Sequence, residues 1–236
     1  MRHRTSLWHS LLLAALATAP LGAQGTAAAP PQTKPPAPAQ PAQPRETREQ
    51  WQRIPDIFVA LRVAPGSRVA DVGAGDGYFT ERLAKHVGPG GRVFAVDVVE
   101  SALAQLRRLV EGEKLANVEL VLGEADDPRL PYGTLDAALV VNAYHEMVQH
   151  APMLAGIRRA LRPGGVLVIV DNAPTDSAAP RYRQTGEHQL ALPLAEQDLR
   201  EAGFEVVERV PGFVTQQHDG HTHRQWLLVG RRPGGE

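Results

Sequence analysis

The sequence predicts an α/β fold, in which an open, mostly parallel sheet of seven strands, with an antiparallel last strand, has helices on both faces. Short apolar runs alternate with segments of helical periodicity from residue 46 onward. The run at 135–141 is almost entirely apolar, which is typical of a strand covered on both faces. No helical segment separates the last two apolar runs, so we expect these strands to be antiparallel neighbours.

The apolar runs and the helical periodicity place each element. We expect strands at residues 69–72, 92–96, 118–122, 135–141, 166–170, 204–210 and 225–229. We expect helices at residues 46–61, 80–86, 100–112, 150–161 and 194–202, the first of them interrupted by Pro55. In sheets of this kind ligands bind at the carboxyl ends of the strands. The candidate site residues named below lie at or near such ends.

Residues 1–45 are expected to lie outside the folded domain, which we place at residues 46–236. Residues 1–23 are typical of a secretory signal peptide, because a basic start precedes an apolar run far shorter than the ~20 residues of a membrane-spanning helix. The alternative is a buried N-terminal helix. Residues 24–45 are rich in Ala and Pro and predict a disordered tether. We therefore expect a periplasmic protein with no stable transmembrane helix after cleavage, or one tethered to the inner membrane if uncleaved.

Composition narrows the possible functions. The formal net charge is -1 at pH 7, which argues against a nucleic-acid surface held by bulk electrostatics. The chain has no cysteine, which excludes disulfides, thiolate metal sites and any mechanism that needs a thiol. A small-molecule substrate is the expected partner.

A glycine-rich loop follows the first predicted strand and carries the strongest signal. Glycines at 73, 75 and 77 allow a tight turn and a close approach of the backbone to a ligand. Their spacing differs from the Gly-x-Gly-x-x-Gly of dinucleotide enzymes. Asp71, before the loop, suits a ligand with a positive amino-acid end and would repel a pyrophosphate. The alternative is a glycine-rich turn that binds nothing.

Asp97 is the second signal. It closes the second predicted strand, 20 residues after Gly77. An acid at this point can accept two hydrogen bonds from ribose hydroxyls. The alternative is an N-cap for the helix that begins near residue 100.

Together these residues resemble the class I S-adenosylmethionine-dependent methyltransferases, which have a Rossmann-like fold. The resemblance covers residues 66–170 well and the remainder loosely, and it extends to exported bacterial methyltransferases and, more distantly, to quinone-biosynthesis C-methyltransferases. It implies that S-adenosylmethionine is the cofactor, with its methionine part lined by the segment from Asp71 through Gly73, Gly75 and Gly77 to Tyr78. Asp97 would hold the ribose.

Two further segments resemble the family. Residues 123–131 look like its acidic adenine-binding turn, with Asp126 as the expected contact to the adenine amino group. The turn is longer than the common pattern, which leaves Glu124 as an alternative contact and a solvated turn as another. Residues 161–167 look like the turn into the fifth strand.

The fourth predicted strand ends in Asn142, followed by Tyr144 and His145, and the resemblance implies that this point faces the transferred methyl group. His145 is the candidate general base, because the pKa of histidine lies near neutrality. Tyr144 is expected to order the acceptor or the cofactor, and Asn142 to bind the cofactor. The alternatives are that these residues cap the next helix or line solvent. Methyl transfer can also proceed by positioning alone.

Two polar segments leave alternatives open. Residues 171–192 suit a substrate lid or a solvated loop equally well; their polar residues are Asp171, Arg181, Tyr182, Arg183, Glu187 and His188. The histidines at 218, 221 and 223 lie between the last two strands, where a long hairpin turn is expected. We expect a solvated turn there rather than a metal site, and we assign no metal ligands.

The expected function is therefore that of a methyltransferase that uses S-adenosylmethionine on a small-molecule acceptor, at oxygen, nitrogen or carbon. The alternative is an exported S-adenosylmethionine- or nucleoside-binding module without catalysis. A nucleotide-dependent oxidoreductase is the weaker third possibility, because the loop spacing and Asp71 argue against it.

Overall fold

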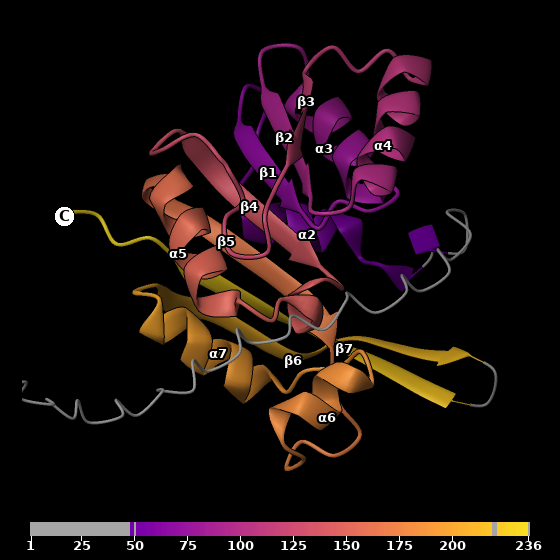
Figure 1. The fold of residues 1–236 in the computed structure, drawn as a ribbon, viewed down its shortest axis with the longest axis vertical. Helices are drawn as coiled ribbons and strands as arrows, with labels where there is room; N and C mark the ends of the chain where they lie inside the picture. The colour runs from indigo at the N-terminus through magenta and orange to yellow at the C-terminus, as the bar shows by residue number, and fades with distance from the viewer. Residues whose placement is uncertain (1–47, 50, 219–220, 236) are drawn as a thin grey trace, which may run out of the picture. The chain divides into compact units, whose positions relative to one another are not determined.

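A computed structural model describes residues 48–49, 51–218 and 221–235, so the expected signal peptide (1–23) and tether (24–45) lie outside the described residues. The described residues form one seven-stranded sheet in the order β3-β2-β1-β4-β5-β7-β6 (Figure 1). The strands are β1 (Arg68–Val72), β2 (Arg92–Asp97), β3 (Val118–Leu122), β4 (Leu135–Val141), β5 (Leu161–Asn172), β6 (Glu205–His218) and β7 (His221–Arg231). Strands β1 to β5 are parallel, and β7 is antiparallel to both β5 and β6. The predicted sheet is confirmed.

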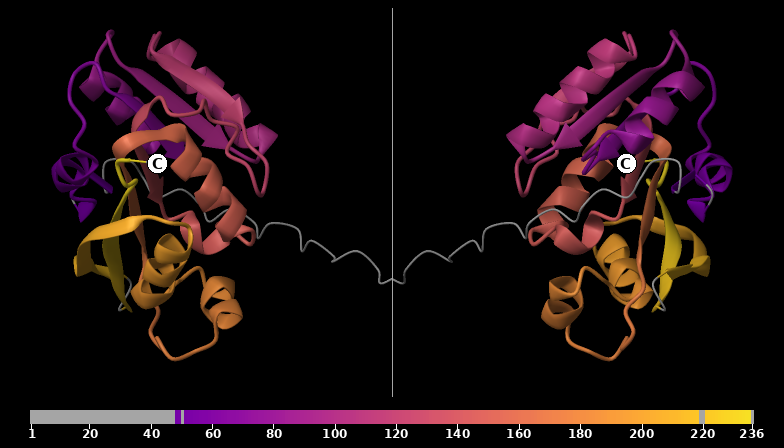
Figure 2. Two further views of the ribbon diagram at one scale, coloured as in Figure 1. Left: turned by 90° about the vertical axis from the view of Figure 1, so that its left-hand side faces the viewer. Right: turned by 90° about the vertical axis from the view of Figure 1, so that its right-hand side faces the viewer.

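Helices cover both faces of the sheet (Figure 2). They are α2 (Ile54–Leu61), α3 (Tyr78–Val87), α4 (Glu100–Gly112), α5 (His150–Ala160), α6 (Arg181–Gly186), α7 (Leu192–Glu201) and the 3-10 turn η1 (Tyr144–Glu146). From residue 137 onward the side chains of β4 alternate: Ala137, Leu139 and Val141 pack with α2 and α3, and Ala138 and Val140 pack with α5 and α7. This two-sided burial explains why the run at 135–141 is apolar throughout.

Several elements differ from the sequence expectations. Strands β5 and β7 begin earlier than expected, at Leu161 and His221, in segments that were expected to be turns. The helix expected at 46–61 is interrupted: residues 48, 49 and 51 are helical, Arg53 then has a left-handed backbone with a φ of 50°, and α2 begins at Ile54. Pro55 lies in the first turn of α2, where a missing N–H is tolerated. Helix α6 was not predicted, since six residues give too little periodicity. Strand β6 runs on to His218, past Pro211 and Gly212, through a register shift between Val210 and Val214.

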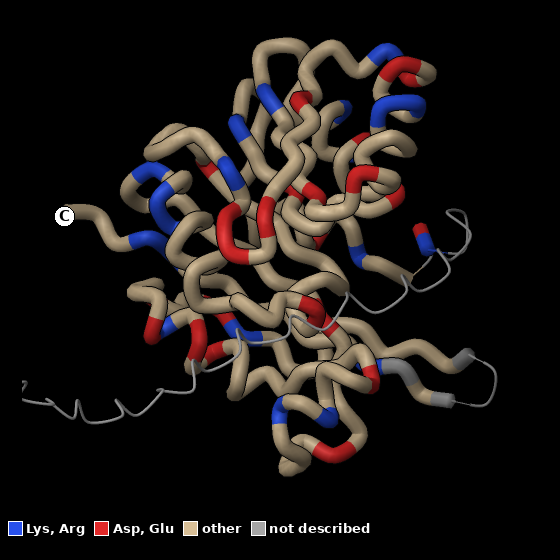
Figure 3. Tube along the Cα trace, in the orientation of Figure 1, with Lys and Arg blue, Asp and Glu red and all other residues tan. Residues whose placement is uncertain are grey.

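The surface of the described residues is of mixed charge. Acidic and basic residues are interspersed along the trace (Figure 3). Among these residues, no helix combines the length and the apolar character needed to cross a bilayer.

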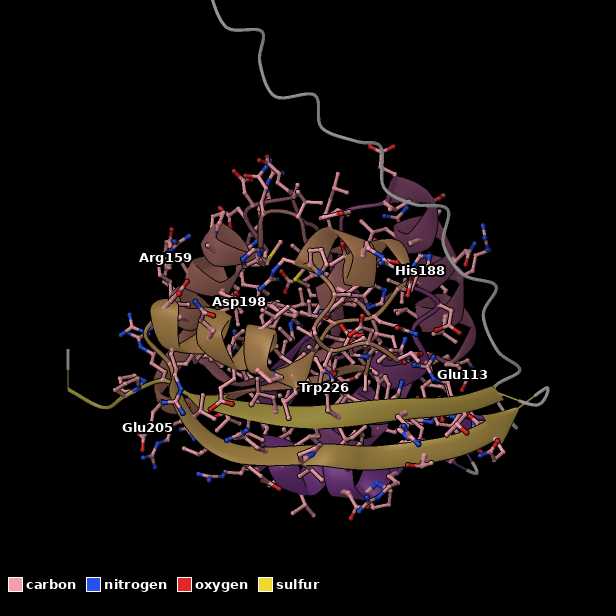
Figure 4. All side chains as sticks on the ribbon, turned by 90° about the horizontal axis from the view of Figure 1, so that it is seen from below. Glu113, Arg159, His188, Asp198, Glu205 and Trp226 are labelled. Atoms are coloured by element: carbon pink, nitrogen blue, oxygen red, sulfur yellow. The ribbon has the colours of Figure 1, made fainter. Side chains whose placement is uncertain are left out.

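Trp226 joins the antiparallel end of the sheet to the segment before α7 (Figure 4). Its side chain is buried in the core with Leu199 and Phe204. Its Nε1 donates a hydrogen bond of 2.7 Å to the carbonyl of Leu190, which is also buried. The bond gives a hydrogen-bond partner to a buried backbone carbonyl that lies outside the sheet, between α6 and α7.

We expect Trp226→Phe to lower the free energy of unfolding by about 2–4 kcal/mol, because it leaves the Leu190 carbonyl unpaired and opens a cavity. Denaturant unfolding would measure the loss. Tyr132→Phe is the matched control, since Tyr132 is 70% exposed and its change should stay within about 0.5 kcal/mol. Equal stability of the two variants would contradict the role assigned to Trp226.

Candidate active site

The glycine loop joins β1 to α3, and its three glycines all have positive φ, at 78°, 53° and 78° for Gly73, Gly75 and Gly77. A Cβ on Gly73 would lie 2.5 Å from the Cβ of Ala143, and one on Gly77 would lie 2.5 Å from a methyl group of Leu109. A Cβ on Gly75 would meet nothing within 4 Å. Two glycines are therefore required by packing, and the third leaves the loop open on the side where a ligand can approach the backbone.

Asp97 ties the loop to the end of β2. Its Oδ2 accepts a hydrogen bond of 2.9 Å from the amide of Gly75, and its Oδ1 accepts one of 2.9 Å from the amide of Val99. The N-cap residue of α4 is Val99, which makes no side-chain capping bond, so Asp97 is not the N-cap of that helix. Each carboxylate oxygen keeps a further lone pair for a hydroxyl donor. This arrangement suits the predicted ribose contact.

Asp71 lies beneath the loop and is buried. Its Oδ2 accepts a hydrogen bond of 2.7 Å from the hydroxyl of Thr80 on α3. Burial raises the pKa of Asp71 to about 6, and the Thr80 hydrogen bond and the charge of Arg48 oppose that rise. A cationic group of a ligand placed near this carboxylate would favour its ionised form.

Tyr78, at the start of α3, lies against two guanidinium groups. The Arg48 guanidinium is 4.3 Å and the Arg82 guanidinium 3.8 Å from the centre of the Tyr78 ring. Such cation–π contacts are favourable and are strengthened by burial. Burial lowers the pKa of Arg48, although the nearby Asp76 and Asp71 carboxylates oppose the shift. Arg48, which comes just after the expected tether, was not anticipated as part of the site.

A chain of amides extends from Arg48 to the end of β4. Nε of Arg48 donates to Oε1 of Gln52 at 3.0 Å, and Nε2 of Gln52 donates to Oε1 of Gln225 at 3.2 Å. Nε2 of Gln225 then donates to Oδ1 of Asn142 at 2.7 Å and to Oδ1 of Asn172 at 3.1 Å. Asn142 has a φ of 52°, in the left-handed region. Strained backbone of this kind is concentrated at functional sites.

The acidic turn after β3 is tied to β2 by a hydrogen bond of 3.0 Å from the amide of Gly123 to the carbonyl of Asp97. The carboxylate of Glu124 is paired with the guanidinium of Arg129. The side chain of Asp126 is exposed. Of the two candidate adenine contacts, the geometry thus favours Asp126, because Glu124 already has a partner.

His145 lies in η1, just beyond the end of β4, and its side chain is only 2% exposed. Its Nδ1 lies 2.7 Å from Oδ1 of Asp171 on β5, and its backbone amide donates to Oδ2 of the same carboxylate at 2.8 Å. Burial lowers the pKa of His145, but the hydrogen bond to Asp171 and the nearby Asp171 and Glu146 carboxylates outweigh it and raise the pKa to about 9. Asp171 therefore fixes both the position and the orientation of the imidazole.

Glu146 and His188 complete this cluster. Oε1 of Glu146 lies 3.7 Å from Nε2 of His145 and 3.5 Å from Nδ1 of His188. The rings of His145 and His188 meet edge to face, with 5.5 Å between their centres. The neighbouring imidazole of His145 lowers the pKa of Glu146, while partial burial opposes the shift. His188 has a φ of 56°, a second strained position at the same edge of the sheet.

The hydroxyl of Tyr144 is hydrogen-bonded to Asp198 and not to the His145 cluster. This buried hydroxyl donates to Oδ2 of Asp198 at 2.8 Å. Asp198 lies on α7 and is labelled in Figure 4. Asp198 also accepts two hydrogen bonds of 2.7 Å from Arg181 on α6. Burial raises the pKa of Tyr144, as do the charge and hydrogen bond of Asp198, so the hydroxyl is a neutral donor. This geometry gives Tyr144 a positioning role as the anchor of η1.

The structure thus brings Asp71, Asp97 and the glycine loop together, and it places His145 next to that loop through Ala143. Sequence reasoning flagged Asp171 and His188 only as members of a polar segment. One feature of the sequence could have predicted the contact between Asp171 and His145. Asp171 lies near the end of β5, which is parallel and adjacent to β4, so both residues lie at the same edge of the sheet. The contributions of Arg48, Gln52 and Gln225 had no local signal.

Residues 69–165 match the family of methyltransferase domains. The demethylmenaquinone methyltransferase of Symbiobacterium thermophilum is 28% identical over 174 residues, which make up 73% of this chain and 69% of that protein. The ubiquinone/menaquinone biosynthesis C-methyltransferase of Ectopseudomonas mendocina is 31% identical over 110 residues, which make up 46% of this chain and 43% of that protein. The chain spans 31% and 44% of the length of two other curated relatives.

Solved structures show the same fold. An S-adenosylmethionine-dependent methyltransferase from Aquifex aeolicus superposes with a TM-score of 0.65 at 24% identity. The match covers 79% of this chain and 92% of that one. At this identity the likeness establishes the fold alone.

We expect Gly73→Ala to destabilise the protein by clearly more than Gly133→Ala. Both positions have positive φ, which costs an alanine about 1–2 kcal/mol, but only the Cβ at position 73 meets another atom within 4 Å. Denaturant unfolding of both variants would measure the difference. Adding Ala143→Gly to Gly73→Ala should recover the excess loss. Equal losses at 73 and 133 would refute the contact between the loop and the end of β4.

Proposed function

The chain carries a methyltransferase domain of the class I, S-adenosylmethionine-dependent type, and on this premise we propose that it transfers a methyl group from S-adenosylmethionine to a small-molecule acceptor. The observation that carries the proposal is the cradle formed by the glycine loop and Asp97. Gly75 leaves the loop open, and the Asp97 carboxylate, held by the Gly75 amide, keeps lone pairs for hydroxyl donors.

The residues present fit the cofactor in their chemistry. Asp97 would hold the two ribose hydroxyls, and the ionised form of Asp71 would balance the positive amino group of the methionine part. Asp126 would accept from the adenine amino group. Tyr78 and Asn142 would border the methionine part. Tyr78 directly follows the loop and contacts Arg48, and the hydrogen-bonded chain that begins at Arg48 ends at Asn142.

When bound, S-adenosylmethionine supplies a methyl group on an electrophilic sulfonium, whose sulfur keeps the bonding electrons as the acceptor's lone pair forms the new bond. The protein's share is to orient the acceptor, because approach geometry supplies much of the acceleration in such reactions. His145 is the proposed catalytic residue, since Asp171 fixes its imidazole just beyond the end of β4. Its pKa of about 9 means that the imidazole must first lose a proton before it can act as a general base.

The acceptor class is proposed from the relatives. Two of them are named for methylation in the biosynthesis of quinones, so reduced quinones and other hydroxylated aromatic compounds are the first acceptors to test. Release of S-adenosylhomocysteine on addition of such an acceptor would support the proposal. Tight calorimetric binding of a nicotinamide dinucleotide with no binding of S-adenosylmethionine would overturn it.

We expect Asp97→Asn to weaken the binding of S-adenosylhomocysteine by about 1.5–3 kcal/mol, the range for a lost charged hydrogen-bond partner. Asn has one acceptor oxygen, so it can keep the hydrogen bond from the amide of Gly75 or that from Val99 but not both, and the free energy of unfolding should fall by about 1 kcal/mol. Isothermal titration calorimetry measures the affinity. Glu119→Gln is the control, because Glu119 lies on β3 and is paired with the exposed Arg92. Unchanged affinity with reduced stability would make Asp97 a purely structural residue.

We expect the affinity for S-adenosylmethionine to fall about tenfold between pH 7 and pH 5, because the pKa of Asp71 in the free protein is about 6. The sign follows from charge: the cationic amino group favours ionised Asp71, and this form is lost as the pH falls through 6. Calorimetry at several pH values measures the slope, and Asp71→Asn should abolish it. The same slope in Asp71→Asn would assign the pH dependence to another group.

A further inference from the structure

Two buried imidazole nitrogens beside the site have no hydrogen-bond partner among the described residues. They are Nε2 of His145 and Nδ1 of His188. The closest carboxylate oxygen to the first, Oε1 of Glu146, is 3.7 Å away, beyond hydrogen-bonding distance. Burial of an unpaired polar atom lowers stability, so two such atoms facing one carboxylate indicate a missing partner.

The spacing of these atoms fits a metal ion. Nε2 of His145, a carboxylate oxygen of Glu146 and a ring nitrogen of His188 all lie within 4.8 Å of one another. A tetrahedral ion with ligands about 2.1 Å away would separate neighbouring ligand atoms by about 3.4 Å. The distances from Oε1 of Glu146, 3.7 Å and 3.5 Å, are close to that value.

Asp171 supplies the outer partner that metal-bound histidines require. It accepts from Nδ1 of His145 at 2.7 Å, which places Nε2 on the side of the ring that faces Glu146 and His188, where a metal ion would take the place of the Nε2 proton. The backbone of His188, with its positive φ, is held by a hydrogen bond of 3.1 Å from Nδ2 of Asn172 to the His188 carbonyl. A divalent ion would also balance the charges of the two carboxylates, Glu146 and Asp171.

We propose that His145, Glu146 and His188 bind one divalent transition-metal ion at the carboxyl ends of β4 and β5. Two imidazoles and one carboxylate suit Zn²⁺ or Fe²⁺, whereas Mg²⁺ and Ca²⁺ prefer oxygen ligands alone. Glu146 is 45% exposed at its side chain, which leaves the site a path for the ion. This site lies apart from the hairpin histidines that the sequence analysis considered for a metal.

Three protein ligands leave at least one coordination position open. An acceptor oxygen or nitrogen bound there would lose its proton more readily, because a bound cation lowers the pKa of such a ligand. This role for the ion rests on the proposed function, whereas the metal site itself does not. His145 would then act on the acceptor through the ion.

The test is a metal titration of the full chain after treatment with a chelator. Zn²⁺ competing with a chromophoric chelator gives affinity and stoichiometry, and Co²⁺ gives visible absorption bands that report its ligands. We expect one ion per chain. His188→Ala and Glu146→Gln should each weaken its binding by about 100-fold or more, and Asp171→Asn by about 10- to 100-fold. His188 is the preferred variant because it lies in a surface loop, outside every helix and strand.

Two controls decide the location of the ion. The double variant His221→Ala/His223→Ala should keep the ion, and so should His150→Ala, whose imidazole lies near Asp198. Binding that disappears with the hairpin histidines but survives His188→Ala would overturn the proposal, as would the absence of binding at micromolar Zn²⁺. Calorimetry with S-adenosylmethionine on the same samples tests the methyltransferase proposal separately, because its failure would leave the metal result standing.

Discussion

The contact between Gly73 and Ala143 is the constraint on which the site depends. No side chain larger than hydrogen fits at Gly73, so the loop after β1 and the segment after β4 meet at backbone distance. The loop cannot retreat, because the amides of Gly73 and Ala74 donate to the carbonyl of Val96 on β2 at 2.9 Å and 3.0 Å. Three strand ends are thereby held together, and His145 follows two residues after the contact. The geometry of this edge of the sheet is set by main-chain packing before any polar side chain takes part.

Three buried aspartates at strand ends show how the sheet accommodates charge at this edge. Asp71, Asp97 and Asp171 lie in β1, β2 and β5, and each is stabilised differently. Asp71 has a hydroxyl partner and a raised pKa, Asp97 has two backbone amides, and Asp171 has an imidazole as well as amides. Asp71 is therefore the one whose charge state is most open to influence by a bound cation. The other two act as fixed elements that orient a loop and a ring.

The sequence predicts the sheet and the cofactor side of the site because both are local. A short apolar run marks each strand, and the loop from Asp71 to Gly77 with Asp97 beyond it is contiguous with two strands. The acceptor side was predicted less fully, since His188 reaches His145 from 43 residues further along the chain. Nothing local distinguishes Gln225, a polar residue inside a strand, as the hub of hydrogen bonds to Gln52, Asn142 and Asn172. Pro211 and Gly212 predicted the end of the sixth strand, but β6 continues through them because its register with β7 shifts between Val210 and Val214.

The position of Arg48 has a mechanical consequence. Arg48 is among the first described residues, and its guanidinium lies against the ring of Tyr78 while its Nε holds the amide chain that ends at Asn142. Tension applied to the chain before Arg48 would therefore reach the glycine loop and the end of β4 by two routes at once. The first described residues are therefore linked to the glycine loop and to the end of β4 through a single side chain.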